Sequence, residues 1–236
     1  QNTIKNLLLI VLFFLIGCSN QGQEELVPKN LKDDLVYLTQ ISLVKGHLFV
    51  GVELYKNEYF ENAKRHMKHP KSELYAGLIP AFEAKKANGF ASQLEVLALS
   101  VENNEELSMV SSNYKSLLEA INQNENYVDS KSNTFEYKVL LVKSLLEIAA
   151  EEYAIGIVDG NIENKFEYQD ALGFTTVAKD IIKNANSLSP SEEMKRKKII
   201  ELIESLSPLW PSLVPTDSIN GDAVKILTAV SKINSL

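Results

Sequence analysis

The spacing of apolar residues constrains the fold of this chain more than any other feature of its sequence. From Leu31 onward, apolar side chains recur at intervals of three and four residues and seldom alternate singly with polar ones. In segment 30–56, one helical face would carry Leu35, Leu38, Ile41, Val44 and Leu48. We therefore predict an all-α fold, an antiparallel helical bundle that is either one body or two small bundles packed together.

Turn and capping signals divide this helical pattern. Pro70 is expected to end a helix over 58–68, because the residue before a proline is pushed out of the α region. Asn133 with Glu136 reads as a capping box that starts a helix reaching Val158. Asp159-Gly160 should then connect that helix to a partner beginning at Asn164, as a helical hairpin. The polar stretch 123–132 is the best candidate for a long loop or a sub-domain seam.

The N-terminal residues have the features of an export signal. Lys5 precedes an unbroken apolar run, Leu7–Ile16. Its length of about ten residues suits the hydrophobic region of a signal peptide, whereas a helix that spans a bilayer needs roughly twenty. Leu15-Ile16-Gly17-Cys18 resembles the lipobox cut by lipoprotein signal peptidase. That resemblance implies a diacylglycerol on the Cys18 thiol; an ordinary membrane anchor or a buried N-terminal helix remains the alternative.

These signals predict how the chain is organised and where it is located. We expect residues 1–17 to be a cleaved signal peptide, 18–29 a lipidated tether and 30–236 the helical domain. Cys18 is the only cysteine, so the domain has no disulfide. The chain carries a net charge of −7, and removal of Lys5 with the signal makes it −8, which argues against nucleic acid as a partner. Membrane attachment should be through the lipid, on the periplasmic side, and Ser19 favours the outer membrane by resemblance to enterobacterial sorting.

Two acids and one histidine are candidates for a metal site. Glu152 and Glu167 lie at similar distances on either side of Gly160, so antiparallel helices joined there would bring them to about the same height. His47 lies within an apolar helix between Gly46 and Gly51, glycines that indicate close approach by another helix or a ligand. The simpler alternatives are that the acids face water and that His47 is a core residue with its hydrogen bonds satisfied.

A second set of residues is rich in basic groups. His66 and His69 lie three residues apart on one helix, a spacing that could hold a metal ion. The surrounding cations suit an anion or a partner protein better. The set predicted for such contacts is Lys64, Arg65, His66, Lys68 and His69. A solvated helix end with basic residues near its C-terminus is the simpler interpretation.

The region around the two acids resembles a known family. Glu152-Tyr153, Val158–Ile162, Glu167-Tyr168 and Phe174 look like a segment of the extracytoplasmic helical domain attached to bacterial high-affinity iron permeases. Such domains, and the related imelysin-type lipoproteins, are helical bundles implicated in periplasmic metal handling. The resemblance implies iron or another divalent metal as ligand. The imelysin motif Gly-x-His-x-x-Glu is absent, because Gly46 directly precedes His47 and Val50 stands where the acid should be.

The sequence thus predicts a lipid-anchored periplasmic binding module, with iron handling as its role, and not an enzyme. The alternative is a helical protein–protein adaptor, or a structural lipoprotein of the envelope that binds no metal. A resemblance of Gly51, Leu54, Ala63 and Met67 to a single tetratricopeptide unit supports the adaptor, whose partner would be another envelope protein.

The lipid anchor predicts the effect of one substitution. Cys18→Ser should block maturation or release the protein from the membrane fraction, because a serine hydroxyl does not accept the lipid and no second anchor is expected. Membrane fractionation and a mass measurement of the mature N-terminus check this. Unchanged fractionation of the variant would contradict the anchor.

Overall fold

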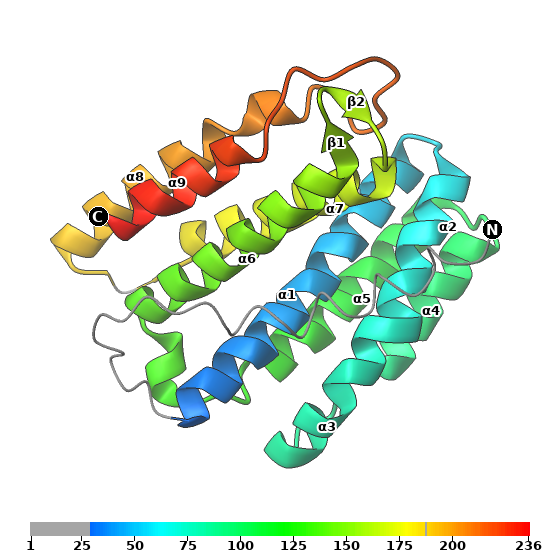
Figure 1. Ribbon diagram of the computed structural model, residues 1–236. Helices are drawn as coiled ribbons and strands as arrows, with labels where there is room; N and C mark the ends of the chain where they lie inside the picture. Colours follow the sequence, from blue (N-terminus) through cyan, green and yellow to red (C-terminus); the bar gives the residue numbers. More distant parts are fainter. Residues whose placement is uncertain (1–28, 187) are drawn as a thin grey trace, which may run out of the picture.

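The computed structural model of the chain describes residues 29–186 and 188–236 (Figure 1). The predicted signal peptide, Cys18 and nearly all of the predicted tether lie outside the described residues. The described part is mainly helical, with one short two-stranded hairpin, which confirms the all-α prediction.

The chain forms its elements in the following order. The helices are α1 (Lys29–Lys56), α2 (Phe60–His69), α3 (Tyr75–Lys85), α4 (Ala91–Glu102), α5 (Leu107–Glu125), α6 (Phe135–Gly156), α7 (Lys165–Lys183), α8 (Pro190–Glu204) and α9 (Val224–Asn234). Two short strands, β1 (Ile157–Val158) and β2 (Asn161–Ile162), lie between α6 and α7 and pair antiparallel. A π-helical turn covers Pro70–Leu74, and 3-10 turns cover Ser130–Asn133 and Ser207–Leu209.

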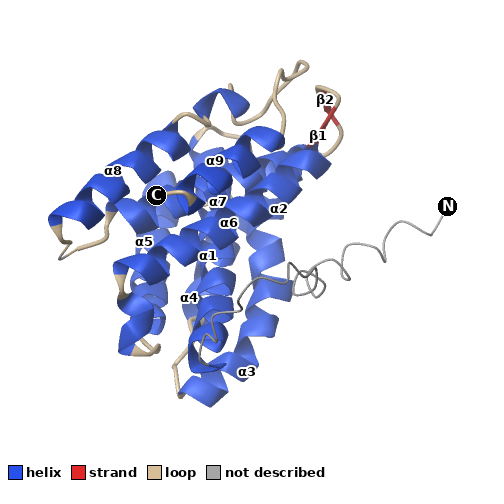
Figure 2. Ribbon diagram, turned by 60° about the vertical axis from the view of Figure 1, so that its left-hand side comes forward, coloured by secondary structure: helices blue, strands red, loops and turns tan. Residues whose placement is uncertain are grey.

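Helix α1 is central to the arrangement. It contacts α2 and α5 on one side and α6 and α7 on the other, as Figures 1 and 2 show. Helix α4 completes the first group by packing on α2 and α5. Helices α8 and α9 cover α7 and α6 from the outside, so α6 to α9 form a four-helix bundle. The two groups meet along α1 and α7.

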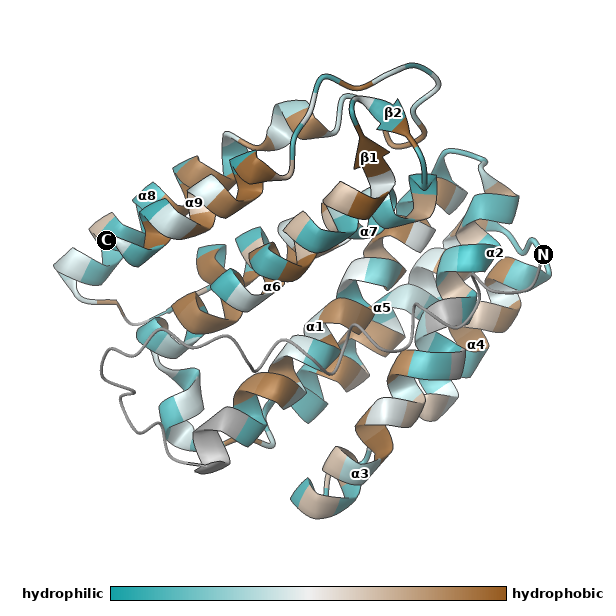
Figure 3. Cartoon of the chain, viewed as in Figure 1, coloured by the Kyte–Doolittle hydropathy of each residue, from teal (hydrophilic) through white to brown (hydrophobic). Residues whose placement is uncertain are grey.

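Helix α1 also combines length with an apolar composition. Of the described helices, it alone is long and apolar enough to cross a membrane by length and composition, over Asp33–Lys56. Two thirds of that window is buried by the other helices, as in the core helix of a bundle. Along the outer helices, hydrophobic and hydrophilic residues alternate with the helical period, which leaves one face for the core and one for solvent (Figure 3).

Helix α2 ends at His69, directly before Pro70 as predicted, but the chain does not leave the helical conformation there. Pro70 has helical angles, φ −59° and ψ −34°, and the chain continues through the π turn into α3. Proline contributes no N–H, so one helical hydrogen bond is lost there, and the wider turn lets the helix continue past the gap.

The antiparallel pairing of α6 and α7 confirms the predicted helical hairpin, with differences at its ends. Helix α6 ends at Gly156 rather than Val158, because Asp159 and Gly160 both have positive φ, which forms the two-residue turn of a β-hairpin. Its N-cap is Thr134, one residue later than predicted, whose side chain accepts from the Tyr137 N–H. Asn164 caps α7 as predicted.

Helices α1 and α7 touch through their backbones. A Cβ added to Gly173 would lie 2.8 Å from the carbonyl carbon of Gly46, and one added to Gly46 would lie 3.1 Å from the carbonyl carbon of Gly173. No side chain fits between the helices at this point. The close approach predicted from Gly46 is therefore made by another helix.

A buried ion pair holds the start of α1 against the connection between α5 and α6. Asp34, which is 3% exposed, forms an ion pair with Lys85 at the end of α3. Its Oδ2 accepts from the Asp129 N–H and the Ser132 hydroxyl, both at 2.8 Å. Burial alone raises the pKa of the Asp34 carboxyl, but the hydrogen bonds from Lys85, Asp129 and Ser132 outweigh it and hold that pKa below its usual value. The predicted loop 123–132 is therefore partly ordered by Asp34, and α5 extends into it as far as Glu125.

The glycine contact predicts a loss of stability. Gly173→Ala should lower the free energy of unfolding by about 1–3 kcal/mol, because α1 and α7 must move apart to admit the methyl group. Gly77→Ala is the matched control, since nothing lies within 4 Å of its added Cβ. That change, in exposed α3, should raise stability by roughly 0.5–1 kcal/mol. Urea denaturation measures both, and equal effects of the two substitutions would contradict the contact.

The Asp34 ion pair predicts a pH dependence. At neutral pH, Asp34→Asn should lower the free energy of unfolding by roughly 3 kcal/mol, because Lys85 loses its buried partner. The folded-state pKa of Asp34 is below the unfolded-state value of about 4, so the wild-type advantage is complete above that pH and is lost as pH falls through the folded-state pKa. Denaturation across pH checks this against Asp33→Asn, which changes an exposed neighbour. A difference that stays constant into acid would contradict the mechanism.

Candidate metal centre

Three polar side chains from different helices meet in the core. His47 on α1, His66 on α2 and Asp170 on α7 are 4%, 3% and 5% exposed. Nδ1 of His47 lies 2.7 Å from Oδ1 of Asp170, and Nδ1 of His66 lies 3.1 Å from the same oxygen. These three atoms all lie within 4.8 Å of one another, the separation expected of ligands around one ion.

Gln169 determines where His66 carries its proton. The amide nitrogen of Gln169 donates to the Leu213 carbonyl at 2.9 Å, which turns the amide oxygen toward Nε2 of His66, also at 2.9 Å. An amide oxygen only accepts, so Nε2 of His66 is protonated and donates to it. In a neutral ring the free lone pair is then on Nδ1, the atom that faces Asp170.

The contact between His66 and Asp170 therefore requires a positive charge. Burial alone raises the pKa of the Asp170 carboxyl, but the charges and contacts of His47 and His66 outweigh it and hold that pKa well below its usual range. A carboxylate oxygen and an imidazole lone pair 3.1 Å apart repel each other in a buried site. The Oδ1 contacts are also not aligned as hydrogen bonds. A proton on the ring or a metal ion between the atoms would supply the missing charge.

A pair of acids lies beside this cluster. The carboxyl groups of Glu152 on α6 and Glu167 on α7 share a hydrogen bond. Burial, and then the hydrogen bond and negative charge of Glu167, raise the pKa of Glu152 to about 9, with Asp170 adding to the effect. The pair therefore holds a proton at neutral pH. Among the described residues, no Lys or Arg forms an ion pair with Glu152, Glu167 or Asp170.

Aromatic rings enclose the two histidines. Phe174 packs edge-on against His47, with ring centroids 5.2 Å apart, and Phe166 lies 5.6 Å from His66. The Arg65 guanidinium stacks over the Phe166 ring at 3.5 Å. These rings exclude water from the cluster, and the low local dielectric strengthens every charge interaction within it.

The structure divides the three residues predicted for a metal site between two groups. His47 belongs to the cluster with Asp170, whereas Glu152 and Glu167 contact each other beside it. His47 is buried, whereas Glu152 and Glu167 are half-buried. Metal binding at these residues stays a prediction.

The basic residues predicted to contact an anion or a partner separate into different environments. His66 is buried beside Asp170, Lys64 pairs with Glu61 at 2.9 Å, and Arg65 covers Phe166. Lys68 is exposed, and the side chain of His69 is outside what the structure describes. A contact through Lys68 and His69 stays a prediction.

Sequence reasoning missed Asp170 and Gln169 as members of the site. Both are nearly fully buried on α7. Their signal was present, since Glu167 and Asp170 are three residues apart and share a helical face. Their partners, however, lie more than one hundred residues away on α1 and α2, and no local pattern gives that distance.

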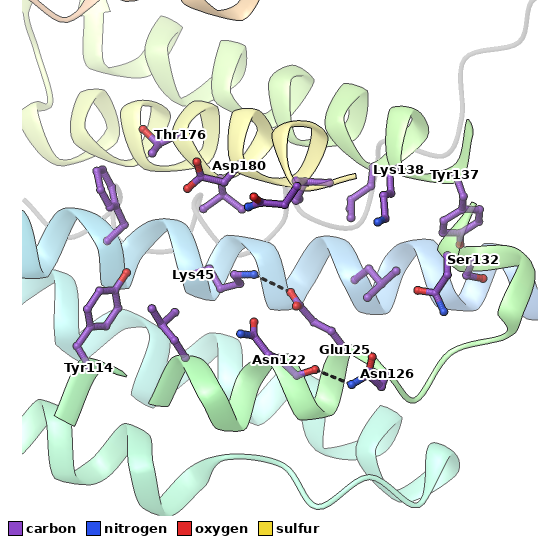
Figure 4. A pocket seen from close by; sticks show the side chains of 18 residues that line it. Lys45, Tyr114, Asn122, Glu125, Asn126, Ser132, Tyr137, Lys138, Thr176 and Asp180 are labelled. Carbon is purple, nitrogen blue, oxygen red and sulfur yellow. Dashed lines mark hydrogen bonds and ion pairs between the residues drawn. The ribbon is translucent and has the colours of Figure 1, made fainter. Parts of the chain in front are cut away.

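A groove also opens on the other side of α1. It has a volume of about 580 Å³ and lies between α1, α5, α6 and α7 (Figure 4). Lys45 pairs with Glu125 at 2.9 Å inside it, and burial raises the pKa of the nearby Tyr114 hydroxyl to about 12. Lys45 and Phe49 lie on the face of α1 opposite to His47, so the groove and the histidine cluster are separate.

Comparison with known proteins identifies a family that part of the chain matches. The sequence model of the iron permease-associated 4-helix bundle domain matches residues 128–236, which contain α6 to α9. No curated protein and no solved structure matches the chain. The match includes Glu152, Glu167 and Asp170, whereas both histidines lie outside it. The C-terminal part of the chain is therefore similar to the iron permease-associated 4-helix bundle domain, which confirms the resemblance that Glu152 to Phe174 indicated.

Proposed function

We propose that this protein is a metal-binding module of the cell envelope that holds a divalent transition-metal ion, iron foremost, at His47, His66 and Asp170. One observation carries the proposal. Gln169 fixes the His66 tautomer, so that a lone pair on Nδ1 faces the Asp170 carboxylate 3.1 Å away, in a site closed to water. A metal ion there would turn a repulsion into two coordinate bonds.

The spacing of the three atoms fits a shared ion. Imidazole and carboxylate ligands lie about 2.0–2.2 Å from such metals, so two ligands of one ion are roughly 2.9–3.5 Å apart. The distances from Oδ1 of Asp170 are 2.7 Å and 3.1 Å. An ion would thus need only a small outward movement of His47.

The donor set narrows the choice of metal. Two imidazoles and one carboxylate suit Fe(II), and they also suit zinc. Mg²⁺ and Ca²⁺ favour oxygen ligands, and Cu(I) favours thiolate or thioether sulfur, which the set of His47, His66 and Asp170 does not supply. The similarity of residues 128–236 to a domain associated with iron permeases supports iron.

The cellular setting completes the proposal. A lipid on Cys18 would hold the protein at a membrane surface, with the helical domain facing the periplasm and residues 18–29 as a tether. The partner class that we propose is a membrane permease for iron, in keeping with the name of the matched domain. The preference for the outer membrane stays a prediction. We propose binding rather than catalysis as the task of the site.

The groove between α1, α5, α6 and α7 favours a second candidate function, that of an adaptor. Its size is within the range of ligand pockets, and it is lined by charged and amide side chains. An adaptor would bind its partner there without needing metal at His66.

Metal binding predicts a gain in stability. At a free Fe(II) concentration of about 100 times Kd, the protein should gain roughly 2.7 kcal/mol, or an increase in Tm of about 5–10 °C. Asp170→Asn should abolish that gain, because it removes the charged ligand. Gln169→Ala should weaken binding by about 10–100-fold, because His66 loses the acceptor that orients it. Anaerobic thermal denaturation and calorimetric titration measure these effects.

The matched control is Asp180→Asn, the same substitution at an exposed position of α7. It should leave metal binding unchanged. Circular dichroism of the metal-free proteins shows whether each variant is folded. An identical response of the Asp170 and Asp180 variants, or no response of the wild type to Fe(II), Zn(II) or Co(II), would refute the proposed site.

A further inference from the structure

The groove between α1, α5, α6 and α7 contains charged side chains that the fold itself does not use. Lys45 and Glu125 neutralise each other inside it, with Nζ and Oε1 2.9 Å apart. Lys138 on α6 and Asp180 on α7 also line the groove, and neither forms an ion pair within the part of the chain that the structure describes. Their side chains lie at separate places along the groove (Figure 4). A ligand would therefore meet one unpaired positive charge and one unpaired negative charge.

Neutral hydrogen-bonding groups surround these charges. The side-chain amides of Asn122, Asn133 and Asn184 line the groove, and none of them hydrogen-bonds to another described residue. The Tyr114 hydroxyl likewise has no acceptor among the described residues, and burial raises its pKa to about 12, so it remains a donor at neutral pH. A side-chain amide offers the same kinds of donor and acceptor as a peptide group. The groove is therefore equipped to pair with the main chain of a peptide.

The groove also has an apolar floor of limited length. Its apolar lining residues are Leu38, Phe49, Leu118, Leu141, Val177 and Ile181. Leu38 and Phe49 are the first and last residues of α1 in the groove, and eleven residues of helix rise by roughly 16 Å. An extended peptide rises by about 3.3 Å per residue. About five extended residues would therefore fill the floor.

We propose that this groove binds an extended peptide segment of about five residues, with an acidic group at Lys138 and a basic group at Asp180. Successive side chains of an extended peptide point to opposite sides, so alternate apolar residues would contact the floor. The main chain between them would pair with the asparagine amides. This inference rests on the second candidate function, for which it names the class of partner, and it does not depend on metal.

A peptide suits this lining better than a lipid does. An acyl chain would cover the apolar floor, but it would leave the asparagine amides and the Tyr114 hydroxyl without partners where it excludes water. A peptide covers the floor with its side chains and pairs those polar groups with its own N–H and C=O groups, as in other modes of peptide recognition. The two unpaired charges of opposite sign then determine the direction in which the peptide lies.

Peptide selection with a charge reversal tests this inference. The probe is a phage-displayed library of random heptapeptides, selected on the full-length wild-type protein. The enriched sequences should carry apolar residues at alternate positions, an acidic residue toward one end and a basic residue toward the other. Lys138→Glu should replace the acidic preference by a basic one. It should also weaken binding of the peptide selected on the wild type by about tenfold, measured by fluorescence anisotropy of the labelled synthetic peptide.

The matched control is Lys143→Glu, the same substitution on α6 at a residue that does not line the groove. It should select the same sequences as the wild type. A reversed preference in Lys138→Glu would not arise from unfolding, because an unfolded protein would lose selectivity altogether. No enriched sequence, or identical sequences from the wild type and Lys138→Glu, would overturn peptide binding. Saturable binding of a fluorescent fatty acid without peptide enrichment would assign the groove to a lipid and overturn it too. Each of these results would leave the metal site standing, because Fe(II) binding is measured separately.

Discussion

The backbones of α1 and α7 touch at Gly46 and Gly173, and the position of every residue in the polar core depends on this contact. With no side chain between the helices, His47, which follows Gly46, reaches Asp170, which lies one turn before Gly173. Gly51 has the same effect one turn further along α1, where an added Cβ would lie 3.3 Å from Cβ of His66 and 2.6 Å from Met67. Small residues on one helix therefore set the distance to both partner helices.

This packing places an energetically costly group of residues in the core. Burying acids and imidazoles without full pairing destabilises a fold, and apolar residues of similar volume would often be more stable there. Among the described residues no Lys or Arg pairs with the buried Asp170 or the half-buried Glu152 and Glu167, and burial and the charge of Glu167 raise the pKa of Glu152. Strongly shifted pKa values in a closed cluster are typical of functional sites. The surrounding Phe166 and Phe174 rings raise the desolvation cost of these polar side chains. The same low dielectric would strengthen their interaction with an ion bound among them.

The ligands are divided between the two helical groups. The part that is similar to the iron permease-associated domain supplies the acids, whereas α1 and α2 supply the histidines. A four-helix bundle of α6 to α9 alone would offer only oxygen ligands. Docking on α1 and α2 adds two imidazoles, which would shift the preference of a metal site there from hard cations toward transition metals. The interface between the groups is thus the place where metal choice would be determined.

The spacing of apolar residues was enough to predict the helices, because apolar residues on the buried face of a helix recur with a period of 3.6 residues. Asp159-Gly160 predicted the turn that brings α6 and α7 together, since that pair adopts positive φ at low cost. The π turn that continues the chain helically past Pro70 was not predictable, because it depends on packing of that turn against α1 and α4.

The same division applies to the site. Glu152 and Glu167 could be paired from the sequence because one short turn separates their helices, and Gly46 with Gly51 marked α1 as a helix that others approach closely. The union of His47 and His66 with Asp170 was decided by tertiary structure alone. It depends on how α7 packs against α1 and α2, which lie more than one hundred residues earlier in the sequence. Helical periodicity predicts which face of a helix is buried but not which helix that face contacts.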